Sequence, residues 1–378
     1  MSVYYITNCG YGDEHGCRAV TLSAVNKSIY ISSLLSQLGI TWTNVCAPLS
    51  QKGEIGFPTQ HVEGNFGESV IVGPSLHYKS SIGLLLAKIF QRLWFTFFIL
   101  FNVHKGDTVI AYHSLEKLFP LLVLKHIKRA NLILEVEEIY GKIAHNMNKI
   151  KKEMETNILQ MADAYIIPNP SLMTYIHNDT KRFCVIEGNI HSENRIANPP
   201  DDSRIHVVYS GIINQDKGAK MITDIAKYLT DGFLLHIIGF GSEEDVAALN
   251  DQISKHNLNL TTAHVVYDGI KKGKDYIEYL QKCHIGLCPQ VVDDDYNDAS
   301  FPSKISSYLS NGLRVVATDT NAVRNSRLSR FIRTAPYDAK AIAETIKDVD
   351  VLSCYPIKEA LDSLAEEQIH DLKRLISE

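Results

Sequence analysis

The segment from Asp298 to Thr318 places a proline, a lysine and a glycine where a helix could bind an anion. Pro302 suits the first turn of a helix, because its missing N–H removes no hydrogen bond there. The free N–H groups and the dipole of such a turn attract anions, and Lys304 adds a full positive charge. Gly312 then ends the helix before a strand at Val315–Thr318. The pattern predicts a diphosphate at Ser303 and Lys304; an ordinary capped helix–strand unit is the alternative.

Further glycine-containing turns follow strands in the same half of the sequence. The turn from Gly211 to Gly218 contains Lys217 and precedes a helix, which suits phosphate binding. Gly239-Phe240-Gly241 and Tyr267-Asp268-Gly269 follow two other strands. A single Gly-X-Gly is weak evidence, since most are tight turns. Several such loops at the carboxyl ends of one parallel sheet, however, surround the crevice where these sheets bind nucleotides.

Together these motifs resemble the family 4 retaining glycosyltransferases with the GT-B fold, and most closely the bacterial capsule and exopolysaccharide type. The resemblance is good over 205–318, and it implies two Rossmann-like parallel-sheet α/β domains that face each other across the active-site cleft. It rests on Phe301-Pro302-Ser303-Lys304, Tyr308-Leu309, Asn311-Gly312, Lys217-Gly218, Gly239-Phe240-Gly241 and Gly269.

The resemblance also implies roles for individual residues. The donor diphosphate is expected at Lys217, Ser303, Lys304 and Gly12, and the donor sugar at Asp298, Ser300 and Phe301. The nucleotide is expected at Gly211, Gly239, Phe240, Gly241, Tyr267, Gly269 and Ser307. Ala299 and Ser307 stand where many relatives have glutamates, and Ile212 where an arginine is common. These departures leave the identity of the nucleotide unpredicted.

In the first half, three side chains that follow strands are candidates for catalysis. His113 follows the expected strand 107–112, where it could orient an acceptor or take its proton; a hydrogen-bonded structural histidine is equally consistent. Glu135 and Glu137 come at the end of the strand 131–136 and alternate onto one side, with Glu138 on the other. They could bind acceptor hydroxyls or serve as a base, whereas a solvated helix start is the simpler interpretation.

No metal or cofactor is expected. Asp293-Asp294-Asp295 could suggest a metal site, but an acidic run in a loop is more often only solvated. Lysines and helix ends can neutralise a diphosphate without a metal. We therefore expect a nucleotide diphosphate sugar as the donor substrate and a glycan or lipid-linked glycan as the acceptor.

Three other functions compete with glycosyl transfer. A sugar-nucleotide epimerase can use the same architecture, and a non-catalytic sugar-nucleotide-binding scaffold would fit the missing glutamates. A dehydrogenase would carry Gly-X-Gly-X-X-Gly on the first strand–helix turn. Here Gly10-Tyr11-Gly12-Asp13-Glu14-His15 lacks the third glycine.

The elements that would position these residues form two groups. Strands alternate with helices from 1 to 195 and again from 204 to 350, which predicts two parallel-sheet domains. The polar segment 189–202 is the expected linker, and the amphipathic helix 357–378 could pack back on the first domain. The expected strands are 3–7, 41–46, 107–112, 131–136, 164–168, 183–186, 205–209, 234–238, 264–266, 285–288 and 315–318. The expected helices are 22–38, 118–127, 219–229, 243–256, 274–282, 303–311, 339–349 and 357–377.

The segment 82–103 is strongly apolar but interrupted by Lys88, Gln91 and Arg92, so we do not expect it to span a membrane. It suits either a buried helix or a helix that lies on the membrane surface, and the pattern favours neither.

The charge and the cysteine content exclude some classes of protein. The 378 residues carry a net charge of −5, which argues against a general nucleic-acid binder. Seven cysteines without a Cys-X-X-Cys pair predict reduced thiols. We accordingly expect a cytoplasmic protein, with the inner face of the membrane as its expected place if 82–103 is a surface helix.

Overall fold

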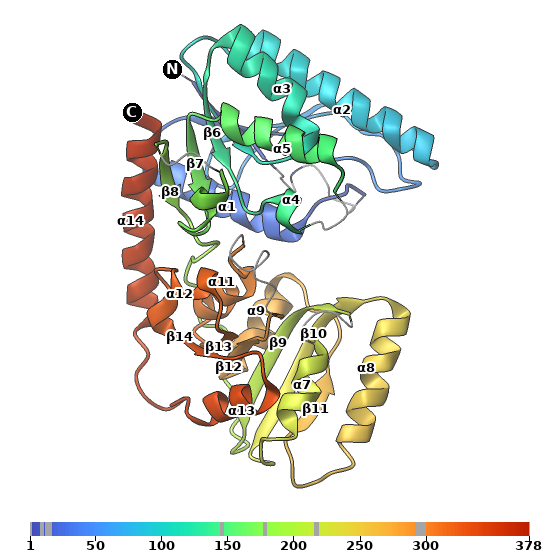
Figure 1. Ribbon diagram of the computed structural model, residues 1–378, viewed down its shortest axis with the longest axis vertical. Coiled ribbons are helices and arrows are strands. Elements are labelled where there is room, and N and C mark those ends of the chain that lie inside the picture. Colours follow the sequence, from blue (N-terminus) through green and yellow to red (C-terminus); the bar gives the residue numbers. More distant parts are fainter. Residues whose placement is uncertain are drawn as a thin grey trace. The chain divides into compact units, whose positions relative to one another are not determined.

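The computed structural model describes residues 2–7, 11, 17–143, 147–176, 180–214, 219–291 and 300–377. The chain divides into two compact units (Figure 1). Unit 1 comprises Met1–Gly188 and Ala365–Glu378, and unit 2 comprises Asn189–Leu364. Each unit has its own sheet and its own apolar core.

Unit 1 contains an eight-stranded sheet in the order β3-β4-β2-β1-β5-β6-β7-β8. All neighbouring strands run parallel except the edge strand β3, which is antiparallel to β4. The strands are β1 (Val3–Ile6), β2 (Trp42–Cys46), β3 (Gln60–Glu63), β4 (Ser69–Val72), β5 (Thr108–Tyr112), β6 (Asn131–Glu135), β7 (Ala164–Ile167) and β8 (Arg182–Val185).

Helices cover this sheet because alternate strand residues are apolar on each face. One face packs on α2, α3 and α5, with Ile99, Leu121 and Ile158 in a shared core. The end of α14 is fixed to unit 1 by Gln368, which accepts from Tyr30 Oη at 2.6 Å and donates to Glu187 at 2.9 Å. The helices are α1 (Leu22–Gln37), α2 (Ser81–Asn102), η1 (Leu115–Lys117), α3 (Leu118–Val123), the π-helical turn η2 (Leu124–Lys128), α4 (Tyr140–Ile143), α5 (Lys149–Met161), α6 (Leu172–Ile176) and, from Ala365 on, α14 (Ile357–Ser377).

Unit 2 contains a six-stranded parallel sheet in the order β11-β10-β9-β12-β13-β14. The odd-numbered residues of β9 and β10, such as Val207, Tyr209 and Leu235, enter a core closed by α7, α8 and α13. The strands are β9 (Ile205–Ile213), β10 (Phe233–Gly241), β11 (His264–Tyr267), β12 (Ile285–Cys288), β13 (Arg314–Thr318) and β14 (Ile332–Ala335). The helices are α7 (Ala219–Ala226), α8 (Glu243–His256), α9 (Gly273–Gln281), α11 (Ser303–Ser310), α12 (Asn321–Arg324), η3 (Ser329–Phe331) and α13 (Ala339–Lys347).

The prediction of two parallel-sheet α/β units is confirmed, but two predicted turns are wrong. Gly211 and Gly239-Phe240-Gly241 do not follow their strands; they lie within them, because β9 and β10 stay paired as far as Ile213 and Gly241. Glycine permits this pairing, since a Cβ on Gly239 would come 1.7 Å from the carbonyl oxygen of Gly211.

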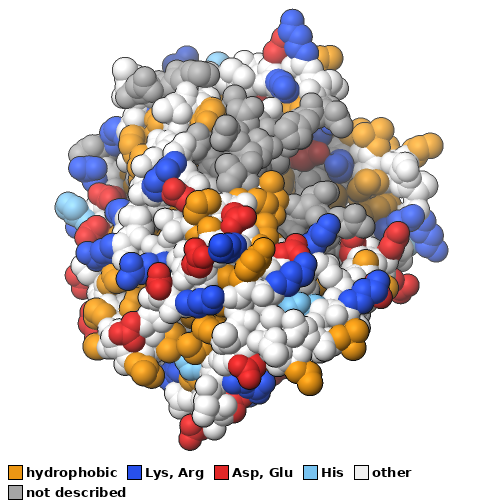
Figure 2. All heavy atoms as spheres, turned by 60° about the horizontal axis from the view of Figure 1, so that its bottom comes forward, with side chains coloured by type: hydrophobic (Ala, Val, Ile, Leu, Met, Phe, Trp, Pro, Cys, Tyr) orange, Lys and Arg blue, Asp and Glu red, His pale blue; other side chains and the backbone are white. Residues whose placement is uncertain are grey.

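The surface carries charges of both signs. On the face in Figure 2, Lys and Arg side chains are interspersed with Asp and Glu side chains. The prediction of reduced thiols is confirmed for Cys283, Cys288 and Cys354. It is wrong for Cys46, which is disulfide-bonded; sequence spacing does not reveal pairs that the fold brings together.

Candidate functional site

Lys304 and Gly211 meet at the carboxyl end of β9 in unit 2. A Cβ placed on Gly211 would lie 2.6 Å from Lys304 Cε and 2.7 Å from Lys304 Nζ. Lys304 Nζ also donates to Tyr209 Oη at 3.2 Å and lies 4.2 Å from the centre of that ring. The ammonium group is therefore held against the glycine backbone, where a phosphate could reach both.

The start of α11 offers backbone donors beside Lys304. Pro302 is the N-cap residue, and its side chain accepts no hydrogen bond from the first turn. Ser303, the first helical residue, is exposed, whereas Phe301 is buried and Ser300 half-buried. Free N–H groups at an exposed helix start can bind an anion, as the sequence predicts.

The two glycine segments predicted to contact the nucleotide are hydrogen-bonded to each other. Gly239 N donates to Gly269 O at 3.0 Å, and Tyr267 Oη donates to Gly239 O at 3.0 Å. Phe240 projects beside them with 53% of its surface exposed. Ser307, on α11, contacts Tyr276 Oη at 3.2 Å, and that hydroxyl also accepts from Ser210 Oγ. These contacts form one polar surface at the carboxyl end of the unit 2 sheet.

Some predicted residues lie outside the described part of the chain. These are Gly12, Lys217, Asp298 and the run Asp293-Asp294-Asp295. Among the residues that the structure describes, no group of three His, Cys, Asp or Glu side chains could hold a metal ion.

In unit 1, His113 is enclosed at the end of β5. Its Nε2 lies 3.5 Å from Glu155 Oε1, and its ring stacks on Tyr140 at 4.9 Å. Burial lowers the pKa of His113 to about 4, and the charge of Lys117 acts in the same direction. The imidazole is therefore neutral near pH 7, and Glu155 is held by the N–H groups of Tyr140 and Gly141, each at 2.7 Å.

Glu135 and Glu137 have different environments. Glu135 is fully buried and accepts a hydrogen bond from Tyr5 Oη at 2.6 Å. Burial, followed by the charge of Glu137, raises the pKa of Glu135 to about 7. Glu137 pairs with Lys27 at 2.9 Å and keeps 25% of its side chain exposed. The carboxyl group of Glu135 can therefore be either neutral or ionised near physiological pH. A general acid or base is most effective when its pKa lies near the pH at which it works.

Sequence reasoning missed several partners of these side chains. Lys27 interrupts the apolar pattern of α1, a signal that could have indicated a buried charge. Lys117 is also buried, its pKa lowered to about 8 by burial, and it donates to the carbonyl oxygen of Tyr112 at 3.2 Å. No sequence pattern indicated Tyr5 or Glu155, since their roles depend on contacts between distant segments.

The structure has the GT-B fold, and solved GT-B glycosyltransferases are similar to it over nearly their whole length. One is described as trehalose-6-phosphate from E. coli bound with UDP-2-fluoro glucose. It is 10% identical, with a TM-score of 0.70, and the match covers 100% of this chain and 98% of that one. Sucrose-phosphate synthase from Thermosynechococcus elongatus is 15% identical, with a TM-score of 0.66 and coverage of 98% and 95%. HepE from Anabaena in complex with UDP is 12% identical, with a TM-score of 0.63 and coverage of 99% and 97%.

A family model matches part of the sequence. Residues 204–349, which lie in unit 2, match the family described as Glycosyl transferases group 1. No curated protein matches the sequence significantly. The matched range contains Gly211, Gly239, Gly269 and Lys304, the residues that form the polar surface described above.

Proposed function

We propose that this protein is a retaining glycosyltransferase that moves a sugar from a nucleotide diphosphate sugar to a hydroxyl of a glycan or lipid-linked glycan. The observation that carries the proposal is the group 1 glycosyltransferase domain at 204–349, with Lys304 held against Gly211 beside an uncapped helix start. Two of the similar structures are complexes with UDP-2-fluoro glucose and with UDP, which favours a uridine nucleotide. Retention and a role in surface polysaccharide synthesis rest on the resemblance to family 4 enzymes.

The leaving diphosphate is stabilised, in this proposal, by Lys304, Lys217 and the N–H groups at Ser303. The acceptor oxygen forms a bond to the anomeric carbon as the bond from that carbon to the diphosphate oxygen breaks. The acceptor proton passes to the leaving phosphate, on the side of the sugar that the acceptor approaches. No metal or cofactor takes part, so a chelator should leave the activity unchanged.

The acceptor is assigned to unit 1, at His113, Glu135 and Glu137. The neutral imidazole of His113 can orient a hydroxyl, and Glu135 can exchange a proton near pH 7. Glu137 is the most exposed of the three and is the one we expect to touch the acceptor.

A thermal-shift panel tests the donor assignment. Ligand that binds the folded state alone raises the melting temperature, so UDP, GDP, ADP and their sugars are each added to the purified protein. We expect a shift with one of these diphosphates and its loss in Lys304→Ala. Binding without turnover over a wide range of acceptors would instead indicate a scaffold, and change of the donor sugar without an acceptor would indicate an epimerase.

We further propose that unit 1 attaches to a membrane surface through α2, which would place the protein at the inner face of a cytoplasmic membrane. Of the described residues, 81–102 form the one helix long and apolar enough to cross a membrane, with 28% of its most apolar window buried. Between Ile82 and Phe101, every exposed residue of α2 is Ile, Leu or Phe, with exposed fractions of 41–76%. They are Ile82, Leu85, Leu86, Ile89, Leu93, Phe97 and Phe101.

Charge and packing favour a surface position over a spanning one. Lys88 and Arg92 lie at one edge of this apolar face and pair with Glu116, which ties α2 to unit 1. Exposed Lys79 and Lys105 flank the two ends of the helix, where they can contact anionic headgroups. An apolar face with basic flanks is typical of a helix that lies in a membrane interface.

Vesicle sedimentation tests this attachment. We expect binding to phosphatidylglycerol vesicles, weakened about tenfold for each of Leu93→Ser and Phe97→Ser, since burying half of such a side chain contributes about 1–1.5 kcal/mol. Leu260→Ser, which removes a still more exposed leucine from unit 2, is the control. No vesicle binding by the unmodified protein at low salt would contradict the proposal, and a change from dimer to monomer in the α2 variants would assign the face to a second copy.

A further inference from the structure

Lys304 carries a positive charge that no carboxylate of the described residues neutralises. Its Nζ donates to Tyr209 Oη at 3.2 Å, and it forms no ion pair within the part of the chain that the structure describes. An ammonium group has three N–H donors, so two of them remain for a ligand. The side chain is half-buried, where a charge without a partner is unfavourable. Lys304 therefore favours an anionic ligand.

Tyr209 holds this ammonium group in two ways. The centre of its ring lies 4.2 Å from Lys304 Nζ, within the range of a cation–π interaction. Its hydroxyl oxygen accepts the hydrogen bond from Nζ, while its single hydroxyl proton is donated to Ile212 O at 3.2 Å. Because that proton is bound to a backbone carbonyl, the lone pairs of the oxygen are left for the lysine. Only 1% of Tyr209 is exposed, and its place in the core of unit 2 fixes the ring.

Gly211 keeps the space next to this pair open. A Cβ at this position would lie 3.3 Å from Tyr209 Oη and 2.7 Å from Lys304 Nζ. Without a side chain there, the ammonium group can approach the backbone at the carboxyl end of β9. A phosphate at this end of the sheet could therefore contact both Nζ and the strand backbone.

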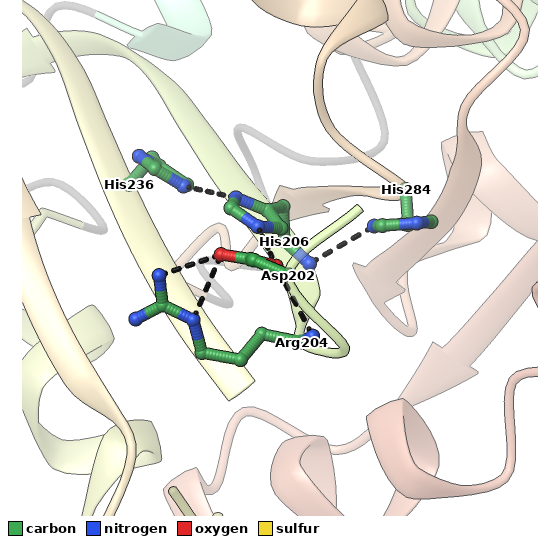
Figure 3. A network of polar contacts seen from close by, with 5 residues as sticks. All are labelled: Asp202, Arg204, His206, His236 and His284. Atoms are coloured by element: carbon green, nitrogen blue, oxygen red, sulfur yellow. Dashed lines mark hydrogen bonds and ion pairs between the residues drawn. The ribbon is translucent and has the colours of Figure 1, made fainter. Parts of the chain in front are cut away.

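A network of polar side chains fixes the strand of Tyr209 from the opposite face of the sheet (Figure 3). His206 on β9 and His236 on β10 have stacked rings 5.1 Å apart, and His206 Nδ1 lies 2.9 Å from His236 Nε2. The backbone N–H of His206 donates to Nδ1 of His284, which directly precedes β12, at 3.0 Å. Asp202 Oδ1 lies 3.0 Å from His206 Nε2. These contacts tie β9 to both of its neighbours, so the loss of one hydroxyl from Tyr209 should not move the strand.

We propose that Tyr209 is a positioning residue for the donor diphosphate, because it fixes Lys304 Nζ at the carboxyl end of β9 without neutralising its charge. This inference rests on the proposed function, since it assigns Lys304 to the diphosphate. A carboxylate in the place of the hydroxyl would also hold the lysine, but it would compete with the phosphate for the ammonium group. The uncharged hydroxyl orients Lys304 and leaves its charge to the ligand.

Binding of two ligands to Tyr209→Phe tests the inference on the full chain. This change removes the hydroxyl and keeps the ring, so the ligand itself must then immobilise the lysine. We expect UDP, GDP or ADP, whichever raises the melting temperature, to bind about two- to tenfold more weakly in calorimetry. The corresponding nucleoside has no phosphate to contact Lys304. It should bind Tyr209→Phe and the unmodified protein equally, which ligand-observed NMR can measure for weak binding.

Tyr165→Phe is the matched control. It removes a similarly buried hydroxyl from unit 1, where Tyr165 Oη donates to Leu159 O at 2.7 Å. This variant should lose stability, yet it should bind both ligands as the unmodified protein does. If Tyr209→Phe weakened the diphosphate and the nucleoside equally, the hydroxyl would act on the fold as a whole, and the inference would be overturned. Unchanged affinity for the diphosphate would overturn it as well.

Lys304→Arg covers the case in which Tyr209→Phe does not fold. The change is on a half-buried helix position, and it keeps the positive charge but replaces the ammonium group by a larger planar guanidinium. If the placement at Tyr209 matters, this variant should also bind the diphosphate more weakly and the nucleoside unchanged. Affinity equal to that of the unmodified protein would show that a charge without this placement is sufficient.

The outcomes also separate this inference from the proposed function. Weak diphosphate binding by Lys304→Ala together with normal binding by Tyr209→Phe would overturn the role of Tyr209 alone. Binding of none of the three diphosphates to the unmodified protein would overturn the proposed function itself. In the double variant Tyr209→Phe/Lys304→Ala, the diphosphate should bind no more weakly than in Lys304→Ala, because Tyr209 acts through the lysine.

Discussion

Gly211→Ala should separate the binding role of Lys304 from the stability of unit 2. The added Cβ would lie 2.6 Å from Lys304 Cε and 2.7 Å from its Nζ, whereas non-bonded carbon contacts are about 3.5–4.0 Å. The flexible end of Lys304 must therefore move by roughly 1 Å. Gly211 is not among the glycines with positive φ, so alanine introduces no backbone strain.

The size of the effect follows from the contact that is lost. A hydrogen bond between an ammonium group and a phosphate contributes about 1.5–3 kcal/mol. Because every 1.4 kcal/mol is tenfold in affinity, we expect the donor to bind about 10- to 150-fold more weakly. The melting temperature should change little, since the displaced side chain is half-buried and free to move toward solvent.

Calorimetry with the donor, alongside thermal unfolding without it, measures the two effects separately. The control is Lys304→Ala: the double variant should bind no more weakly than Lys304→Ala alone, because both changes remove the same contact. Wild-type affinity in Gly211→Ala would refute the assignment of Lys304 to the diphosphate. Additive losses in the double variant would show that Gly211 contributes by a separate route.

Three further changes have defined outcomes. Gly239→Ala places a Cβ 1.7 Å from Gly211 O at a φ of 144°. Denaturant unfolding should therefore show that unit 2 loses about 4 kcal/mol or more of stability. A soluble variant with normal stability would contradict the close pairing of β9 and β10. The pKa of Glu135 is raised from 4.5 to about 7, so the folded state loses stability as the pH rises from the lower value to the higher. This loss is on the order of 1–3 kcal/mol, and it should be absent in Glu135→Gln when melting curves are recorded over this pH range. The pKa of His113 is instead lowered from 6.5 to about 4, so the folded state loses stability as the pH falls through that range. His113→Gln should lose less stability over the same range in acid-unfolding curves. An identical acid transition in both proteins would show that His113 is not buried as described.

Periodicity predicted the architecture because buried parallel strands are short apolar runs between helices. The strand Ile285–Cys288 and the helix Glu243–His256 have the bounds that the sequence indicates. Periodicity failed where glycine is part of a strand: Gly239 resembles a turn in sequence, yet it allows β9 and β10 to approach closely. The edge strand β3 and the polar helix α5 were also missed, since few of their residues are apolar, and so was β4, whose apolar run is only three residues long.

The candidate site was only partly visible in the sequence. Lys304 could be identified because Pro302 marks a helix start near it, which is a local signal. The hydrogen bond between Tyr5 and Glu135 joins residues 130 positions apart, and the pairing of His206 with His236 joins two strands. Such contacts depend on tertiary packing, so no local pattern predicts them.

Transfer of a labelled sugar tests the central claim most directly. The purified protein is incubated with the donor that stabilises it, radiolabelled in the sugar, and with lipid-linked oligosaccharides in phosphatidylglycerol vesicles. We predict that label enters the lipid fraction as nucleoside diphosphate is released in equal amount, and that Lys304→Ala reduces both. Release of no diphosphate in the presence of a bound donor, over a wide range of glycan acceptors, would contradict the assignment as a glycosyltransferase.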